Sequence, residues 1–338
     1  MAGPGAFISG CAGPHLTSGE AAFFKDAQPW GFILFARNIE DAAQLRRLCG
    51  DLRASLGRDA PILIDQEGGR VQRLRPPLAR AWHPPLTQVQ QAGPEAAARS
   101  MYLRYALIGA ELRGFGIDTN CAPMLDVARK ATHPFLRNRC YGFEPAPVAE
   151  IGRAVATGLL AAGVLPVMKH IPGHGRGQVD SHKELPVVGA GPDELSAVDF
   201  APFRALADLP LAMTGHLVYS ALDTQAATVS ARMIALIRQE IGFAGLLMTD
   251  DINMEALGGT SAERARAAIS AGCDLVLHCN GALDEMQAVA TEAGHLPAEA
   301  ELRGQNALAL RAAAGSIDIA GAEAELEALL KGQVYDTE

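Results

Sequence analysis

The sequence predicts an α/β protein, a single (β/α)8 barrel of the TIM type with extra C-terminal helices. Eight short apolar runs recur along the 338 residues, and longer stretches with helical periodicity separate them. Strands that are buried on both faces and alternate with helices form parallel sheets, and eight such repeats close a barrel. No linker rich in Pro, Ser or Gly divides the chain, so we expect one domain over residues 1–338.

The predicted strands are rich in β-branched residues, Leu and Met, which favour buried β-structure. They cover residues 6–10, 31–36, 60–65, 116–123, 164–170, 210–216, 245–251 and 273–279. Apolar residues spaced three or four apart predict helices at 41–56, 147–163, 193–208, 230–242 and 261–272. Gly163, Gly242 and Gly272 stand where left-handed C-caps are expected. The segment from about 297 to 338 is expected to pack as helices against the barrel.

Composition and charge exclude several classes of protein. Hydrophobic residues make up 49% and charged residues 20% of the chain, as in folded globular proteins. No apolar run approaches the roughly 18 residues that a membrane span needs. The net charge of -9 disfavours a surface that coats nucleic acid or anionic membranes. We therefore expect a monomer with a small-molecule substrate and with neither nucleic acid nor membrane as a partner.

The six cysteines are scattered and form no CxxC pair, which is typical of reduced thiols in the cytoplasm. Residues 8–11 look like a lipoprotein cleavage site, but no Lys or Arg precedes Cys11, and Gly and Pro interrupt the segment. A signal peptide needs a basic region followed by an apolar region. We therefore expect no signal peptide here and a cytoplasmic location.

Barrel proteins build their sites from the carboxyl ends of their strands. The polar residues at these ends are Arg37, Asn38, Asp65, Asp126, Lys169, His170, His216, Asp250, Asp251 and Asn280. A barrel with only a structural role would not need so much charge there. Taken singly, Asp126 and Asn280 are interpreted as loop or cap residues, and Asp251 as the N-cap of a helix beginning near Asn253.

Lys169 is one of only five lysines, and it ends an apolar strand. Its stem must be desolvated and its ammonium needs a partner, which suits a Schiff-base role or a ligand-binding role. Asp65 also ends a strand, and Arg70, Arg73 and Arg75 follow it. Carboxylates and guanidinium groups form paired hydrogen bonds with vicinal hydroxyls, so this pattern indicates a hydroxyl-rich ligand, or else a structural ion pair of Asp65 with Arg73.

The segment after Lys169 is rich in histidine, and His170, His174 and His182 invite comparison with a metal site. A helix would place the first two on one face, but Pro and Gly residues between and beside them prevent that helix. The alternative enzyme interpretation is a metal-dependent barrel hydrolase that uses His170, His174, His216 and Asp250. We expect neither a metal nor any other cofactor.

Asp180 and His182 are two residues apart, close enough for the carboxylate to orient the imidazole and raise its basicity. Glycines at positions 173, 175 and 177 precede them. These glycines predict a loop with few stable contacts of its own, which could carry His182 over a bound substrate.

Six segments, in this order and at these distances, resemble one known family. They are IDQEGGRVQR (64–73), APMLDV (122–127), RCYG (139–142), KHIPGHG (169–175), DSHKELP (180–186) and MTDD (248–251). Over about residues 5–290 the chain is similar to bacterial β-N-acetylglucosaminidases of glycoside hydrolase family 3, in particular the single-domain cytoplasmic type of peptidoglycan recycling. Ile171 replaces the usual Phe and Thr249 the usual Ser, which conserves size class or hydroxyl.

The resemblance implies that Asp250 is the nucleophile and that His182, paired with Asp180, is the general acid/base. The sugar ligands that it implies are Asp65, Arg73, Arg139, Lys169 and His170. The implied reaction is retaining removal of terminal N-acetylglucosamine (GlcNAc) from muropeptides. Retaining glycosidases normally use two carboxylates about 5–5.5 Å apart, and a histidine with an ordinary pKa near 6.5 would replace one of them. A sugar-binding protein without turnover is the non-catalytic alternative, which the intact Asp250 and His182 disfavour.

Overall fold

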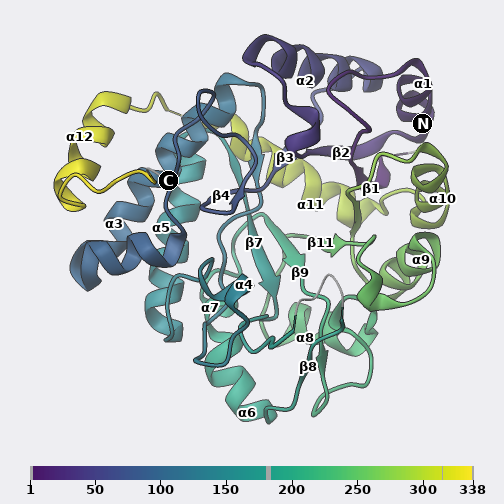
Figure 1. The fold of residues 1–338 in the computed structure, drawn as a ribbon. Coiled ribbons are helices and arrows are strands. Elements are labelled where there is room, and N and C mark those ends of the chain that lie inside the picture. Colours follow the sequence, from purple (N-terminus) through teal and green to yellow (C-terminus); the bar gives the residue numbers. More distant parts are fainter. Residues whose placement is uncertain (1–2, 180–183, 314, 337–338) are drawn as a thin grey trace.

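The computed structural model describes residues 3–179, 184–313 and 315–336 and contains a closed barrel of parallel strands (Figure 1). Neighbouring strands follow the order β1, β12, β11, β9, β7, β6, β3, β2 around the barrel. Each of these eight strands lies within or overlaps one predicted apolar run, so the predicted (β/α)8 fold is confirmed. Their bounds are β1 Gly5–Ser9, β2 Pro29–Leu34, β3 Ile62–Ile64, β6 Thr119–Asn120, β7 Leu165–Ile171, β9 Leu211–Thr214, β11 Leu246–Asp251 and β12 Leu275–His278.

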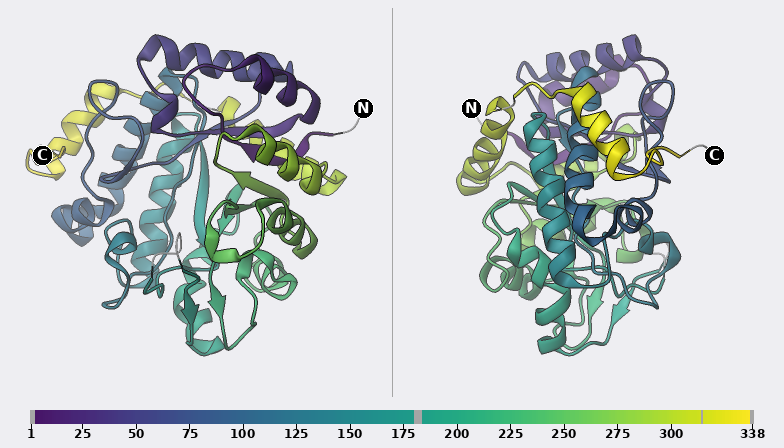
Figure 2. Two further views of the ribbon diagram at one scale, coloured as in Figure 1. Left: turned by 45° about the vertical axis from the view of Figure 1, so that its right-hand side comes forward. Right: turned by 90° about the vertical axis from the view of Figure 1, so that its left-hand side faces the viewer.

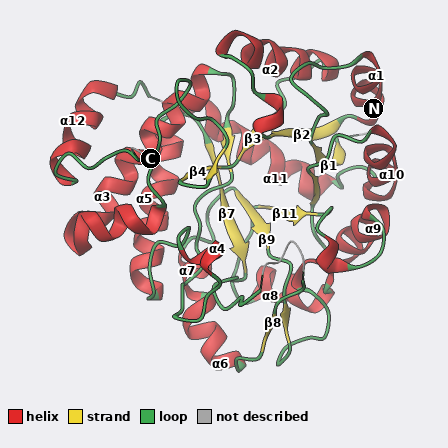
Figure 3. Cartoon of the chain, viewed as in Figure 1, coloured by secondary structure: helices red, strands yellow, loops and turns green. Residues whose placement is uncertain are grey.

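Helices surround the barrel, and two small sheets lie outside it (Figure 3). The α-helices are α1 Ser18–Ala27, α2 Ala42–Leu56, α3 Pro85–Gly114, α4 Pro134–Arg137, α5 Pro145–Ala161, α6 Pro192–Glu194, α7 Ala201–Ala205, α8 Ala231–Gln239, α9 Ser261–Ala271, α10 Leu283–Ala293, α11 Ala298–Ala309 and α12 Ile319–Leu329. Short 3-10 or π turns are η1 Ala36–Asn38, η2 Leu195–Asp199, η3 Ala227–Val229, η4 Glu255–Leu257 and η5 Leu310–Ala313. The small sheets pair β4 Gln66–Gly68 with β5 Val71–Gln72 and β8 Val187–Val188 with β10 Val218–Tyr219.

Side-chain caps define several helix boundaries. Asp41 accepts hydrogen bonds from two backbone N–H groups in the first turn of α2. Thr260 and Glu263 form a capping box at the start of α9. Gly272 ends α9 in the left-handed conformation with φ +109°, as predicted.

Two predicted elements are shorter than expected. The run 116–123 supplies only β6. The Asn120 side chain, at the end of β6, bonds both the N–H and the C=O of Gln66 at 3.0 Å. The helix predicted at 193–208 is divided into α6, η2 and α7. Within it, the Phe200 N–H bonds to the Leu195 carbonyl five residues earlier at 2.9 Å, which widens the helix locally.

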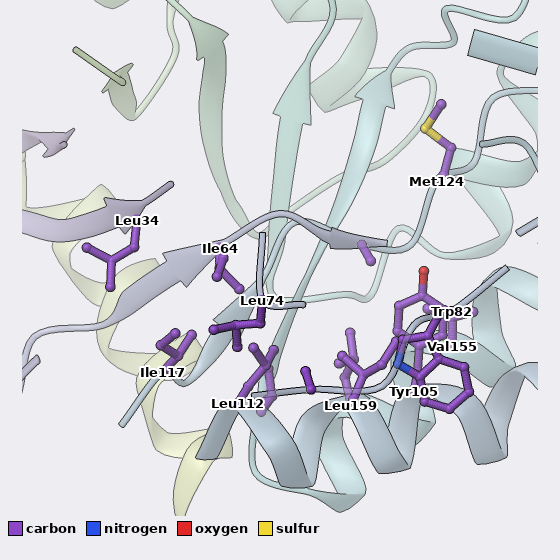
Figure 4. Packing of buried hydrophobic residues seen from close by; sticks show 14 of the residues in the cluster. Leu34, Ile64, Leu74, Trp82, Tyr105, Leu112, Ile117, Met124, Val155 and Leu159 are labelled. Atoms are coloured by element: carbon purple, nitrogen blue, oxygen red, sulfur yellow. The ribbon is translucent and has the colours of Figure 1, made fainter. Parts of the chain in front are cut away.

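The helices α3 and α5 form a closely packed layer on one side of the barrel. A Cβ atom at Gly158 of α5 would lie only 2.4 Å from the Tyr102 carbonyl oxygen of α3, so the contact requires glycine. Figure 4 shows Tyr105 and Leu112 of α3 packed with Leu159 of α5 and Ile64 of β3. Ile64, the last residue of β3, belongs to this apolar cluster, and Asp65 of the cavity follows it directly in the chain.

The C-terminal helix α12 packs on the outer side of α3 (Figures 1 and 2). Arg80 pairs with Glu323 of α12, and the Tyr335 ring packs edge-on against Trp82 with centroids 5.3 Å apart. The six cysteines are all free and buried, as predicted. Among the described residues, the helices are too short or too polar to cross a membrane.

Candidate active site

A cavity of about 440 Å³ opens at the carboxyl ends of the barrel strands, within the size range of about 300–1,000 Å³ typical of ligand pockets. The structure brings six of the eight predicted site residues together around it, and the remaining two, Asp180 and His182, lie outside the described residues. The six are Asp65, Arg73, Arg139, Lys169, His170 and Asp250.

Lys169, near the end of β7, lies at the centre of a buried network of opposite charges. Its Nζ is 2.9 Å from the Asp65 carboxylate and 2.6 Å from the Glu67 carboxylate. The second oxygen of Asp65 binds Arg73 at 3.0 Å, and Arg139 binds Glu67 through two hydrogen bonds of 2.9 and 2.8 Å. The Lys169 side chain is only 2% exposed. The prediction of a desolvated stem and a paired ammonium is therefore confirmed. Asp65 also pairs with Arg73, and because both residues line the cavity, this ion pair leaves the predicted hydroxyl-rich ligand open.

The network keeps its members ionised. Burial raises the pKa of Asp65, but Lys169 and Arg73 outweigh it and hold that pKa well below its usual range. Burial also raises the pKa of Glu67, but Arg139 and Lys169 outweigh it and lower that pKa to about 2. Burial lowers the pKa of Lys169, but Asp65 and Glu67 raise it above its ordinary value. A Schiff base requires an unprotonated amine, so the structure favours a binding role for Lys169.

Glu67 is a central member of the site that sequence reasoning missed. It lies in β4, two residues after Asp65, with its side chain 1% exposed. The signal that could have revealed it is charge balance, because Asp65 alone cannot neutralise Lys169, Arg73 and Arg139 in a buried site. The bidentate contact with Arg139 supplies the missing negative charge.

The structure corrects the interpretation of Asp126 as a loop or cap residue. Asp126 is completely buried, and its Oδ2 lies 2.7 Å from Nδ1 of His170. Its Oδ1 accepts hydrogen bonds from the backbone N–H groups of His170 and His174. A buried carboxylate requires such partners, and here the partner is a ring that lines the cavity. Asp126 therefore orients a site residue.

The neighbouring carboxylates Asp250 and Asp251 have different surroundings. Oδ1 of Asp250 accepts the Asp251 N–H at 2.8 Å, and its Oδ2 lies 4.0 Å from Nε2 of His170. Burial raises the pKa of Asp250, but His170 and His216 lower it below its usual value. Burial and the charge of Asp250 raise the pKa of Asp251 to about 6. The carboxylate of Asp250 is thus the more readily ionised of the two.

Asp251 has a local structural contact, but not the predicted one. Its Oδ1 accepts the Asn253 N–H at 3.0 Å and the Cys279 N–H at 3.3 Å. The α-helix expected near Asn253 begins only at Ser261, after η4. Asp251 therefore stabilises a turn and joins it to the segment after β12.

The histidines of the metal-dependent alternative differ in their contacts. Both ring nitrogens of His174 are buried and have no hydrogen-bond partner among the described residues, whereas His170 bonds to Asp126. His216 bonds to Thr228 Oγ1 through Nδ1 at 2.8 Å and to the Asp251 carbonyl through Nε2 at 3.0 Å. Burial and the nearby His170 lower the pKa of His174 to about 4. Within the described ranges, no three His, Cys, Asp or Glu side chains form a group that could hold a metal ion.

The first part of the glycine-rich loop has more contacts than predicted. Tyr219 donates a hydrogen bond to the Gly173 carbonyl at 2.5 Å, and the His133 N–H donates to the Gly177 carbonyl at 3.0 Å. A Cβ atom at Gly175 would lie 2.0 Å from the Val127 carbonyl oxygen. Glycine is needed here because the chain approaches a neighbouring backbone closely, so the expectation of few stable contacts is wrong for this part of the loop.

The fold and the cavity together define a class of protein. A (β/α)8 barrel that gathers carboxylates and guanidinium groups around one cavity at its strand ends suits an enzyme for a hydroxyl-rich substrate. The chain matches the glycosyl hydrolase family 3 N-terminal domain over residues 15–305. It belongs to glycosyl hydrolase family 3 and is a glycoside hydrolase.

Individual relatives agree with this assignment. The beta-hexosaminidase of Bordetella avium is 37% identical over 288 residues, which cover 82% of this chain and 81% of that protein. The structure of NagZ from Neisseria gonorrhoeae in complex with N-trifluoroacetyl-D-glucosamine is 30% identical with a TM-score of 0.85, covering 97% of this chain and 99% of that chain. A glycoside hydrolase family 3 beta-N-acetylglucosaminidase from Paenibacillus sp. str. FPU-7 is 30% identical with a TM-score of 0.82. The match covers 92% of this chain but only 62% of that longer one.

The charge network predicts a large cost for removing Glu67. In Glu67→Gln, the buried Arg139 loses the negative charge of its bidentate partner, which should lower the free energy of unfolding by about 3–5 kcal/mol. Asp208→Asn is the matched control, because it breaks an exposed pair with Arg153 and should cost about 1 kcal/mol or less. Urea unfolding of both variants at neutral pH gives the comparison, and equal losses would contradict it.

The same variant has a predicted pH dependence. Glu67 has a pKa of about 2 in the folded protein against an ordinary value of 4.5, so its stabilising effect is complete above about pH 4.5 and is lost as the pH falls toward 2. The difference in stability between wild type and Glu67→Gln should therefore narrow over that range. A difference that stays constant down to pH 2 would show that the charge of Glu67 is not responsible.

Proposed function

We propose that this protein is a retaining exo-β-N-acetylglucosaminidase that removes terminal, non-reducing GlcNAc from peptidoglycan fragments during cell-wall recycling. The expected substrates are GlcNAc linked to 1,6-anhydro-N-acetylmuramic acid and the peptide-bearing forms of this disaccharide. The observation that carries the proposal is the position of Asp250, whose carboxylate lines the same cavity as Lys169 and its partners. The beta-hexosaminidase relatives support the reaction class, and the sequence motifs support the substrate.

Binding of the terminal sugar is assigned to the polar and charged residues that line the cavity. Carboxylate and cationic groups can each bond two ring hydroxyls, and the proposed ligands are Asp65, Arg73, Arg139, Lys169 and His170. Apolar side chains of Ile33, Met213 and Leu277 also line the cavity, and each is at most 3% exposed. A cavity that ends against the packed barrel interior suits the end of a sugar chain, which supports exo action.

In the first step, His182 donates a proton to the glycosidic oxygen while a carboxylate oxygen of Asp250 attacks C1. The bond between C1 and the leaving oxygen breaks, which releases the aglycone as an alcohol and leaves GlcNAc esterified to Asp250. The lowered pKa of Asp250 supports its role as an ionised nucleophile. Asp180 would hold the imidazole of His182 in the required orientation.

In the second step, the neutral imidazole of His182 accepts a proton from water as the water oxygen attacks C1. The ester bond breaks, Asp250 leaves as a carboxylate and GlcNAc is released. Each step inverts C1, so the product keeps the β configuration. An imidazole with an ordinary pKa near 6.5 can donate and accept a proton at neutral pH. The proposed enzyme acts as a cytoplasmic monomer and uses no cofactor.

The proposal predicts hydrolysis of an aryl N-acetyl-β-glucosaminide with β-GlcNAc as the first sugar formed. Proton NMR can follow the anomeric signal before mutarotation, with the matching aryl β-glucoside and an EDTA-treated sample as comparisons. GlcNAc substrate should be strongly preferred, and EDTA should have no effect. Initial formation of the α-anomer would refute the Asp250 nucleophile, inhibition by EDTA would favour the metal-dependent alternative, and preference for the glucoside would refute the substrate.

The assignment of His182 predicts an effect that depends on the leaving group. A sugar hydroxyl needs a proton in the transition state, which general acid catalysis typically accelerates by about 10²–10⁴-fold, whereas a dinitrophenolate hardly needs one. In His182→Ala, disaccharide cleavage should therefore collapse, while the first step with a dinitrophenyl glycoside should survive far better. Asp180→Ala should show a milder form of the same pattern. If His182→Ala slows both substrates equally, His182 is a binding or structural residue.

A further inference from the structure

Asp126, His170 and Asp250 form a row that leads from the buried side of the site to the cavity. Oδ2 of Asp126 lies 2.7 Å from Nδ1 of His170. The opposite ring nitrogen, Nε2, lies 4.0 Å from Oδ2 of Asp250. The Asp126 and His170 side chains are 0% and 7% exposed, whereas Asp250 is 20% exposed and lines the cavity. One imidazole therefore separates a fully buried carboxylate from the proposed nucleophile.

The contacts of Asp126 fix which ring nitrogen carries a proton. Burial raises the pKa of Asp126, but His170 and His174 lower it below its usual value, so the carboxylate is ionised. An ionised carboxylate only accepts hydrogen bonds, and the 2.7 Å contact therefore requires a proton on Nδ1 of His170. The backbone N–H groups of His170 and His174 hold the carboxylate in place through its other oxygen.

We propose that Asp126 is a positioning residue that acts through His170 on Asp250. With Nδ1–H directed to Asp126, the ring presents Nε2 to the Asp250 carboxylate and to the cavity. The 4.0 Å separation is too long for a direct hydrogen bond, so Nε2 is available to one sugar hydroxyl beside Asp250. The inference rests on the proposed function, because it takes Asp250 as the nucleophile.

This fixed pair differs in role from the proposed acid/base pair of His182 and Asp180. Asp126 lies in the segment that follows β6, His170 lies in β7, and both residues are buried. Precise placement of a reacting group requires such rigid support. Attack by Asp250 occurs whatever the leaving group is. A defect in Asp126 should therefore slow good and poor substrates by the same factor, unlike a defect in His182.

Asp126→Asn tests the proposal without changing the size of the side chain. The amide oxygen can still accept the two backbone N–H groups, but the amide nitrogen would donate to Nδ1 and move the ring proton to Nε2. The loss of such a supporting contact should lower kcat by about 10- to 100-fold, and KM should rise by a smaller factor because His170 is also a proposed sugar ligand. The same factor is expected for the disaccharide and for the dinitrophenyl glycoside.

A double-mutant cycle shows whether the effect passes through His170. In a His170→Ala background, Asp126→Asn should change kcat by less than about twofold, because the shared partner is already absent. Asp274→Asn is the matched control, since Asp274 is also buried and accepts a backbone N–H, from Leu247 at 2.8 Å, but lies at the opposite end of β11. It should leave kcat unchanged, with folding checked by thermal unfolding.

Three outcomes would overturn the proposal: wild-type kcat in Asp126→Asn, an effect on KM alone, or an equal loss with and without His170. If Asp126→Asn does not fold, ¹⁵N NMR of the histidine-labelled wild type tests the proposal through the protonation of the His170 ring. The His170 signals are assigned as those that are missing from the spectrum of His170→Ala. Nδ1 should be protonated, and an unprotonated Nδ1 would overturn the proposal. Failure of the proposed function is distinct, because the wild type itself would then not hydrolyse the GlcNAc glycosides.

Discussion

The cluster of buried charges around Lys169 is the constraint on which the site depends. Removing an ion from water costs several kcal/mol, and only a well-placed opposite charge offsets that cost. Asp65 follows β3, Glu67 lies in β4 and Arg139 follows α4. Their contacts with Lys169 and with one another link these three segments to β7. These pairs link the segments that form the barrel rim around the cavity, which is the proposed sugar site.

On the proposed function, the site has a binding half and a reacting half. The binding half is the network around Lys169, in which the carboxylates are already neutralised by cations and can exchange part of their hydrogen bonding with sugar hydroxyls. The proposed nucleophile Asp250 belongs to the reacting half, where its Oδ2 lies 4.0 Å from Nε2 of His170. In this proposal, the cavity binds the polar sugar ring through one half and leaves the Asp250 carboxylate free to attack it.

Much of this arrangement follows from sequence alone. Eight buried apolar runs predict a closed parallel barrel, and parallel strands bring their carboxyl ends together, which is why Asp65, Lys169 and Asp250 meet. Glu67 and Asp126 could not be assigned, because their partners lie 72 and 44 residues away and pattern reasoning gives no such pairings. The choice of Asp250 over Asp251 came from the family resemblance. The structure adds a physical difference, since Oδ1 of Asp251 bonds to two backbone N–H groups of its own surroundings.

Covalent trapping tests the central claim, that Asp250 is the group that attacks the sugar. A 2-fluoro or 5-fluoro sugar with a good leaving group slows the second step and lets the glycosyl-enzyme accumulate. Proteolysis and mass spectrometry then locate the adduct, with Asp250→Gly as the control that should bind GlcNAc but gain no label. The account predicts one labelled residue, Asp250. A label on Asp251 or on Glu255 would contradict it.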